Sequence, residues 1–190
     1  MKSIAIFGSG KGTNAKNIIN YFKFHKKISV QLIVTNNASA GIIDVAKKAK
    51  INILTFNNIN PNSSKNILEK LKKNQINLIV LAGFLLKVPS IIINSFPNSI
   101  INIHPALLPK FGGKGMYGLN VHKAVLEKKE SWSGITIHHI NHEYDKGKII
   151  FQAKCDVLKN DTIKLLAKRV QKLEYEFYPI IIKKLIENDN

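Results

Sequence analysis

Short apolar runs alternate with helical patterns through the first hundred residues of the chain. The runs have the length of single strands, and the fourth, INLIVLAGF, is nearly continuous in apolar residues, which is typical of a strand with both faces covered. Between the runs, apolar residues recur at helical spacing, as at Ile18, Ile19 and Phe22. The expected strands are 3–7, 28–35, 51–56, 76–84 and 99–104, and the expected helices are 14–26, 41–49, 63–74 and 89–94.

The pattern changes after residue 104. Segments 133–140 and 148–158 are expected to pair as antiparallel strands. A long helix is expected over 161–187, and Pro179 is expected to bend it. The residues of this helix that we expect to face inward are Leu165, Leu166, Val170, Leu173 and Phe177.

These elements predict an α/β fold, a Rossmann-like three-layer architecture whose sheet is mainly parallel, with an antiparallel C-terminal strand pair and a long C-terminal helix. A length of 190 residues fits a single domain. In the helix at 63–74, Ser64 is the expected N-cap, and Leu68 and Leu71 are expected to point inward.

The formal net charge of +17 raises the possibility of a nucleic-acid or membrane-surface partner. The alternative is compositional drift, because Ile, Asn and Lys, which share AT-rich codons, make up about two residues in five, and Arg169 is the only arginine. Proteins that clamp phosphates usually favour arginine. No apolar run approaches the ~20 residues that cross a bilayer. We therefore expect no nucleic-acid and no membrane partner, and the single Cys155 suggests a reducing, cytoplasmic location.

The segment FGSGKGTN, residues 7–14, follows the first strand and opens the first helix. Its glycines fall at every second position, which matches neither the nucleoside-triphosphate pattern nor the dinucleotide pattern. Glycines and a helix N-terminus still suit a lone phosphate monoester, with Thr13 and Asn14 as caps and donors and Lys11 adding charge. The alternative is a strand-to-helix turn without a ligand.

Asn102 and His104 project to the same side of the fifth strand, which ends at Pro105. The carboxyl edge of a parallel sheet is where ligands bind. Asp145 lies in a turn between two later strands, and a carboxylate beside a histidine raises the histidine pKa and keeps it cationic. An amide and a cationic imidazole would stabilise an oxyanion, which suggests direct acyl transfer to an amine. Alternatively, Asn102 and His104 only close the strand, and Asp145 only forms the turn.

Five motifs occur in the order found in the folate-dependent formyltransferases: GSGKGTN, LAGFLLKVP, NIHPALLPKFGGKG, GITIHHI and YDKGKIIFQ. The chain resembles that family over nearly its full length, and in particular the members that formylate glycinamide ribonucleotide. The resemblance implies 10-formyltetrahydrofolate as co-substrate, no metal, small-molecule substrates, and a monomer or homodimer. It also implies a nucleotide-phosphate half, 1–100, and a catalytic and folate half, 101–190.

The resemblance implies roles for individual residues. The catalytic residues would be Asn102, His104 and Asp145. The substrate phosphate would bind at Gly12, Thr13 and Asn14, and the ribose at Glu174. The folate would bind at Lys65, Leu85, Leu86, Lys87, Val88 and Asn102.

Three other readings stay open at this stage. A methionyl-tRNA formyltransferase shares the catalytic trio and is favoured by the charge, but it carries an extra C-terminal domain, and this chain ends soon after the long helix. A formyltetrahydrofolate deformylase uses water as acceptor and carries an extra N-terminal domain, whereas here the first strand begins at Ser3. A non-enzymatic domain that binds a phosphate ligand or nucleic acid would need no trio.

Overall fold

Seven strands form one sheet in the order β3-β2-β1-β4-β5-β6-β7 in the computed structural model, which describes residues 1–188. The chain divides into two compact units. The first unit comprises residues 1–101 and the described residues from Ile182 onward, and the second unit comprises Asn102–Ile181. The expected fold class is confirmed: the sheet is mainly parallel, its last two strands are antiparallel, and a long helix ends the chain.

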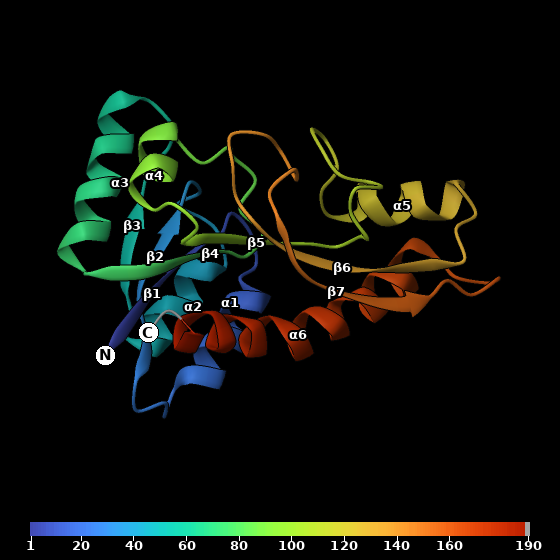
Figure 1. Ribbon diagram of the computed structural model, residues 1–190, viewed down its shortest axis with the longest axis horizontal. Helices are drawn as coiled ribbons and strands as arrows, with labels where there is room; N and C mark the ends of the chain where they lie inside the picture. Colours follow the sequence, from blue (N-terminus) through green and yellow to red (C-terminus); the bar gives the residue numbers. More distant parts are fainter. Residues whose placement is uncertain (189–190) are drawn as a thin grey trace. The chain divides into compact units, whose positions relative to one another are not determined.

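The first unit is a parallel sheet of apolar strands with helices between them (Figure 1). Strand β1 pairs in parallel with both β2 and β4, and β2 pairs with β3. The strands are buried because successive residues are apolar on both faces. The elements are β1 (Lys2–Phe7), α1 (Thr13–Phe22), β2 (Ile28–Thr35), α2 (Ile42–Ala49), β3 (Asn52–Thr55), α3 (Pro61–Lys73), β4 (Ile76–Leu81) and α4 (Ser90–Ser95).

Two helix boundaries in the first unit differ from expectation by two or more residues. Helix α1 ends at Phe22 rather than at residue 26, because the His25 ring accepts the backbone N–H groups of Lys27 and Ile28 and turns the chain toward β2. Helix α3 begins at Pro61, and Asn60 caps it by accepting the N–H of Ser63.

The expected cap of α3, Ser64, was therefore wrong. The reason is that proline suits the first helical position, where no N–H is needed. The helix therefore begins at Pro61, before the first residue of its apolar pattern. Ser64 is instead buried within the helix. Leu68 and Leu71 are buried as expected.

The second unit holds the antiparallel pair and most of the long helix. Strand β5 (Ile100–His104) enters this unit at Asn102. Strands β6 (Trp132–His139) and β7 (Ile149–Asp156) pair antiparallel, with a register shift between Ile137 and His138. Helix α5 (Leu119–Glu127) precedes them, and it had not been expected from the sequence. It is short, it starts at Gly118 without a side-chain cap, and His122 occupies a position on its buried face.

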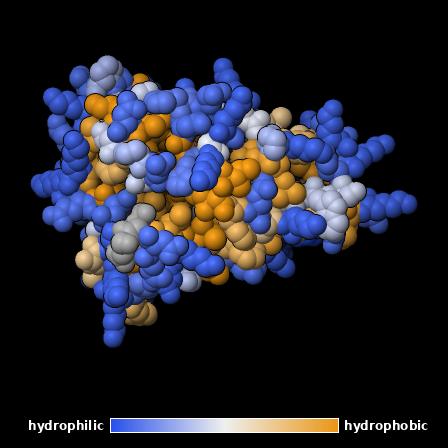
Figure 2. Space-filling view, viewed as in Figure 1, coloured by the Kyte–Doolittle hydropathy of each residue, from blue (hydrophilic) through white to orange (hydrophobic). Residues whose placement is uncertain are grey.

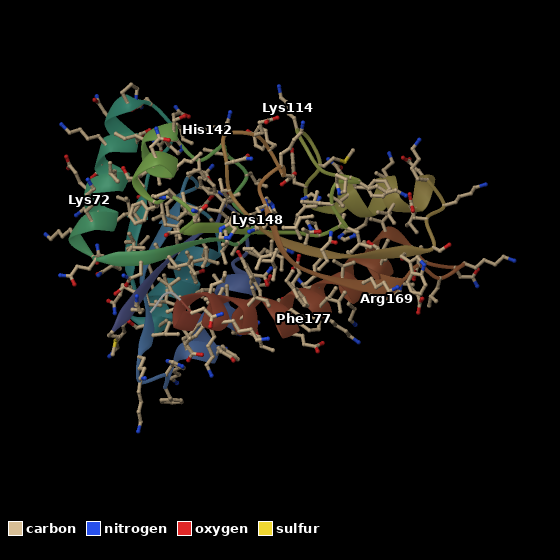
Figure 3. The ribbon with its side chains drawn as sticks, in the orientation of Figure 1. Lys72, Lys114, His142, Lys148, Arg169 and Phe177 are labelled. Carbon is tan, nitrogen blue, oxygen red and sulfur yellow. The ribbon has the colours of Figure 1, made fainter. Side chains whose placement is uncertain are left out.

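Helix α6 (Ile163–Asn188) confirms the expected long helix. Leu166 and Val170 are buried, but the inward placement of Leu165 was wrong, since its side chain is 52% exposed. The residue lies about 100° around the helix from Leu166 and so falls on a different face. Phe177, labelled in Figure 3, packs against Phe151 of β7 with ring centroids 5.0 Å apart.

Lysines lie at exposed positions in both units. Figure 2 shows many hydrophilic residues on the surface of one face, with hydrophobic residues between them. Lys72, on α3, and Lys114, in the loop after β5, are two of the exposed lysines and belong to different units (Figure 3). Within residues 1–188, no helix combines the length and apolar character needed to span a membrane.

Candidate active site

Four side chains form a connected cluster in the second unit. His104, only 3% exposed, places Nδ1 3.6 Å from Asp145 Oδ2. His138, fully buried on β6, places Nε2 3.6 Å from Asp145 Oδ1 and 3.2 Å from Asn102 Nδ2. The structure thus brings together all three residues of the expected catalytic trio and adds a second histidine that links two of them.

His138 is the member that the sequence reasoning missed. Its Nδ1 lies 2.8 Å from the carbonyl oxygen of His139, which can only accept, so Nδ1 carries the hydrogen. The lone pair of Nε2 is then left to accept from the Asn102 amide, and this fixes which way the amide points. A signal was available, because His138 falls two residues after Thr136, on the same buried face of β6.

Asp145 is held in a tight turn. Its φ is +55°, a left-handed conformation that a residue with a side chain adopts at a cost. Two residues later, a Cβ on Gly147 would lie 1.7 Å from the carbonyl oxygen of His139, so only glycine fits there. Such strain is retained where a side chain must be aimed, and here it aims the carboxylate at two imidazoles.

The loop that follows His104 is anchored by a buried hydroxyl. Thr136 Oγ1 donates to the carbonyl of Ala106 at 2.7 Å and accepts the N–H of Leu108 at 3.0 Å. Gln152 Nε2 donates to the same hydroxyl at 2.8 Å and to the carbonyl of Leu108 at 3.0 Å. These bonds tie the loop to both β6 and β7, and they hold the end of β5 in place.

The expectation that Asp145 keeps His104 cationic was wrong for the protein without substrate. Burial lowers the pKa of His104, and the Asp145 carboxylate and the hydrogen bond to Phe111 offset only part of that effect. The neighbouring His138 lowers the pKa of His104 further. Because the histidine is almost completely withdrawn from water, desolvation of the charged form outweighs the neighbouring carboxylate.

The carboxylate and a third histidine respond differently to the same surroundings. Burial raises the pKa of Asp145, but the neighbouring His138 and His104 rings and the hydrogen bond from the N–H of Gly113 outweigh it, so the net shift is downward. Burial lowers the pKa of His122 on α5 to about 4, with a smaller contribution from His104. Asp145 is therefore ionised near neutral pH, and His122 is neutral there.

In the first unit, Gly12 is the N-cap of α1, and Thr13 and Asn14 are its first helical residues. The expected capping by Thr13 and Asn14 was wrong, because the N-cap is a glycine with no side-chain hydrogen bond. Gly12 has a φ of +74°, and a Cβ there would lie 2.7 Å from the Cα of Ile42, so glycine is required on two counts. The N-terminus of α1 therefore has no side-chain cap at its N-cap position.

Ser9 joins the glycine loop to the segment after β4. Its N–H donates to the carbonyl of Gly83 at 3.0 Å, and its hydroxyl accepts the N–H of Leu85 at 3.0 Å and donates to Asn36 Oδ1 at 2.5 Å. Sequence reasoning did not single out this serine. In the segment it contacts, Val88 is buried, Leu86 is half-buried, and Leu85 and Lys87 are exposed.

The two remaining expected site residues lie on helices. Lys65 is exposed on α3, and Glu174 is half-buried on α6, one turn before Tyr178. Among residues 1–188, no three histidine, cysteine, aspartate or glutamate side chains are grouped so that they could hold a metal ion.

Comparison with known proteins assigns the family. The model of the family described as "Formyl transferase" matches residues 2–182. The chain is 39% identical to "Phosphoribosylglycinamide formyltransferase, chloroplastic" of Arabidopsis thaliana over 98% of the chain and 66% of that protein. It is 32% identical to "Phosphoribosylglycinamide formyltransferase" of Bacillus subtilis over 100% of the chain and 97% of that protein. The chain thus spans just under two thirds of the plant relative and nearly all of the bacterial one.

Solved structures agree with the sequence relatives. The structure of phosphoribosylglycinamide formyltransferase from Bacillus halodurans is similar with a TM-score of 0.90 at 29% identity, covering 100% of this chain and 97% of that chain. Glycinamide ribonucleotide transformylase 1 from Symbiobacterium toebii gives a TM-score of 0.88 at 30% identity, covering 99% and 89%. The resemblance inferred from the sequence motifs is therefore confirmed, and the chain belongs to the formyl transferase family.

Proposed function

We propose that the protein transfers the formyl group of 10-formyltetrahydrofolate to the amine of glycinamide ribonucleotide, in purine biosynthesis. The observation that carries the proposal is the cluster in the second unit, where Asp145 lies beside both His104 and His138, and His138 contacts Asn102. The names of the relatives in bacteria and plants support the same reaction. The proposed location is the cytoplasm, although two relatives are named as chloroplastic.

In the proposed reaction, the amine nitrogen of the ribonucleotide attacks the formyl carbon, and the carbonyl oxygen takes up the negative charge. Asn102 donates a hydrogen bond to that oxygen, and the positive charge of a protonated His104 stabilises it. The growing negative charge favours uptake of a proton from water by His104 at Nδ1. The imidazolium pairs with Asp145 until the intermediate collapses and the proton returns to water. Neutral His104 in the free protein is therefore compatible with a cationic His104 in the transition state.

The tetrahedral intermediate collapses when the bond from the formyl carbon to N10 of the folate breaks. Asp145, acting directly or through a water, moves the proton from the attacking amine to N10, so that formylglycinamide ribonucleotide and tetrahydrofolate are formed. The carboxylate suits this relay because it is ionised near neutral pH. The formyl group passes directly from the folate to the amine, so no covalent bond to the protein forms at any stage.

The binding roles follow from local structure in each unit. The phosphate is assigned to Gly12, Thr13 and Asn14, where the N-terminus of α1 offers backbone donors. The folate is assigned to the segment of Leu85 to Val88, with Asn102 and Lys65 as further contacts. The ribose hydroxyls are assigned to Glu174. We further propose that the protein is a monomer or homodimer and has no nucleic-acid or membrane partner.

The proposal is tested by offering 10-formyltetrahydrofolate with one acceptor at a time and following tetrahydrofolate release. Glycinamide ribonucleotide should support rapid turnover, and water and methionyl-tRNA should not. Transfer to methionyl-tRNA but not to the ribonucleotide would overturn the assignment. Asp145→Asn serves as the matched variant, because it keeps the shape of the side chain while removing the charge, and it should lose most of the turnover.

A further inference from the structure

One short turn, Phe111–Gly113, contacts both His104 and Asp145. The carbonyl oxygen of Phe111 lies 2.8 Å from His104 Nε2. The N–H of Gly113 donates to Asp145 Oδ2 at 2.8 Å. This is the same carboxylate oxygen that lies 3.6 Å from His104 Nδ1. The turn thus contacts the ring nitrogen of His104 that faces away from Asp145 and the carboxylate oxygen of Asp145 that faces His104.

The contact with Phe111 decides which ring nitrogen carries the proton. A carbonyl oxygen can only accept, so His104 Nε2 must donate, and the neutral ring is the Nε2–H tautomer. Nδ1 is then left facing Asp145, ready to take a second proton and form the ion pair. Both hydrogens of the imidazolium would have acceptors in place, so the turn prepares the ring for the charged form.

Gly112 makes this arrangement possible because it has no side chain. A Cβ at this position would lie 2.5 Å from Leu108 Cδ2 and 3.1 Å from the Cβ of Asp145. The first contact involves the end of a flexible side chain, which can move aside. The second involves the rigid base of the catalytic carboxylate, which sits in a strained turn and cannot move without changing its aim.

The backbone on both sides of Gly112 is also unusual. Phe111 has a φ of +58° and Gly113 a φ of +98°. A phenylalanine in the left-handed region persists only where surrounding contacts impose it. The contacts here are the hydrogen bonds to His104 and Asp145.

We propose that Gly112 is a positioning residue, which sets the tautomer of His104 and the aim of Asp145 by letting the Phe111 carbonyl and the Gly113 amide reach them. The kinetic consequence rests on the proposed function, whereas the tautomer does not. The added methyl group in Gly112→Ala should push the turn away from Asp145. It should weaken both the hydrogen bond from His104 to Phe111 and the one from Gly113 to Asp145.

The first test is nitrogen-15 NMR of the histidine rings in the full chain. Wild-type His104, when neutral, should show the Nε2–H tautomer. Gly112→Ala should show a mixture of tautomers and a changed titration midpoint for His104. The titrating groups that face His104 are Asp145 from the β6–β7 loop, His138 from β6 and His122 from α5, so their signals are followed in the same spectra.

Two further variants separate positioning from packing. Gly115→Ala alters a nearby left-handed glycine, φ +88°, whose added Cβ would meet nothing within 4 Å, and it should keep the wild-type His104 spectrum. Leu108→Ala combined with Gly112→Ala removes the 2.5 Å contact but keeps the one to Asp145, so the spectrum should stay altered. A double variant with the wild-type spectrum would overturn the proposal.

The kinetic test follows kcat, KM and the pH profile of Gly112→Ala with both substrates. A displaced turn should lower kcat by about tenfold to a hundredfold, with KM nearly unchanged and the acid limb of the profile displaced. Failure of wild type to transfer formyl groups, together with an altered tautomer in the variant, would refute only the proposed function. A neutral wild-type His104 protonated on Nδ1, or an unaltered spectrum in Gly112→Ala, would overturn the positioning role itself.

Discussion

The interiors of the two units differ in chemistry. Among its described residues, the first unit buries mostly apolar side chains, and the buried polar residues are Ser9, Thr35 and Ser64. The second unit buries three imidazoles together with two hydroxyls: His104, His122, His138, Ser133 and Thr136. The parallel strands therefore supply stability through apolar burial, while the second unit retains polar groups at a cost that its chemistry requires.

That cost is visible at individual atoms. His122 Nδ1 is buried without a hydrogen-bond partner within the described part of the chain, and burial lowers the pKa of this side chain to about 4. Each imidazole that must stay neutral in the interior makes the folded state sensitive to acid. The comparison teaches that the same sheet can hold one region tuned for stability and another tuned for reactivity, and each can be altered separately.

The largest expected effect is on the stability of the first unit. Ile33→Ala removes a fully buried side chain from β2 and should lower the free energy of unfolding by about 2–5 kcal/mol, from lost burial and the cavity left behind. Urea denaturation measures the change, and Ile33→Val should cost about 0.5–1.5 kcal/mol. Turnover of the folded variant should match that of the wild type. A large loss of kcat would contradict the view that stability and reactivity reside in different units.

A change of similar size, but in turnover, is expected from Asn102→Ala in the second unit. Removal of one oxyanion donor typically lowers kcat about a hundred- to a thousandfold. Steady-state kinetics should show that loss, with much weaker effects on ribonucleotide binding and on stability, because Asn102 is half-buried. Asn66→Ala, an exposed asparagine of α3, is the control. Equal kcat in wild type and Asn102→Ala would end the assignment.

The cost of a buried imidazole is measured with His122→Leu. The folded pKa of about 4 lies below the ordinary value of 6.5, so the unfolded chain binds the proton first as the pH falls. The wild type should lose up to about 3 kcal/mol through this group between pH 6.5 and pH 4.

In His122→Leu, the part of the pH dependence of stability that comes from His122 should be absent. Acid sensitivity that remains would include contributions from His104, Asp145 and Asp161, whose folded pKa values are also lowered. Urea denaturation at pH 7 and pH 4 gives the two slopes. Identical slopes in the two proteins would show that the buried imidazole carries no such cost.

The smallest expected effect concerns a helix cap in the first unit. Asn60→Ala removes the side-chain acceptor for the N–H of Ser63 and should lower stability by about 1 kcal/mol. Asn62→Ala, at an exposed position within α3, should be neutral. A loss in both variants, or in neither, would contradict the observed cap. Thermal unfolding compares the two, and kcat should stay constant.

The sequence predicted much of the candidate site because its key residues follow strong local signals. Asn102 and His104 lie two positions apart in a strand that Pro105 ends, so their common side follows from strand geometry. The remaining expected site residues were predicted from the family motifs. The sequence did not predict the second histidine, His138, or the turn at Phe111–Gly113, because both act through contacts with residues that are not adjacent along the chain.

The sequence by itself determined the alternation of apolar strands and helices, the fold class and the family, since these depend on neighbouring residues and on motif order. Only the tertiary structure decided that His104 is neutral without substrate, that α5 exists, and that Asn60 rather than Ser64 caps α3. The physical reason is that desolvation, the pairing of buried polar groups and the competition among nearby caps depend on the surroundings of a residue in space.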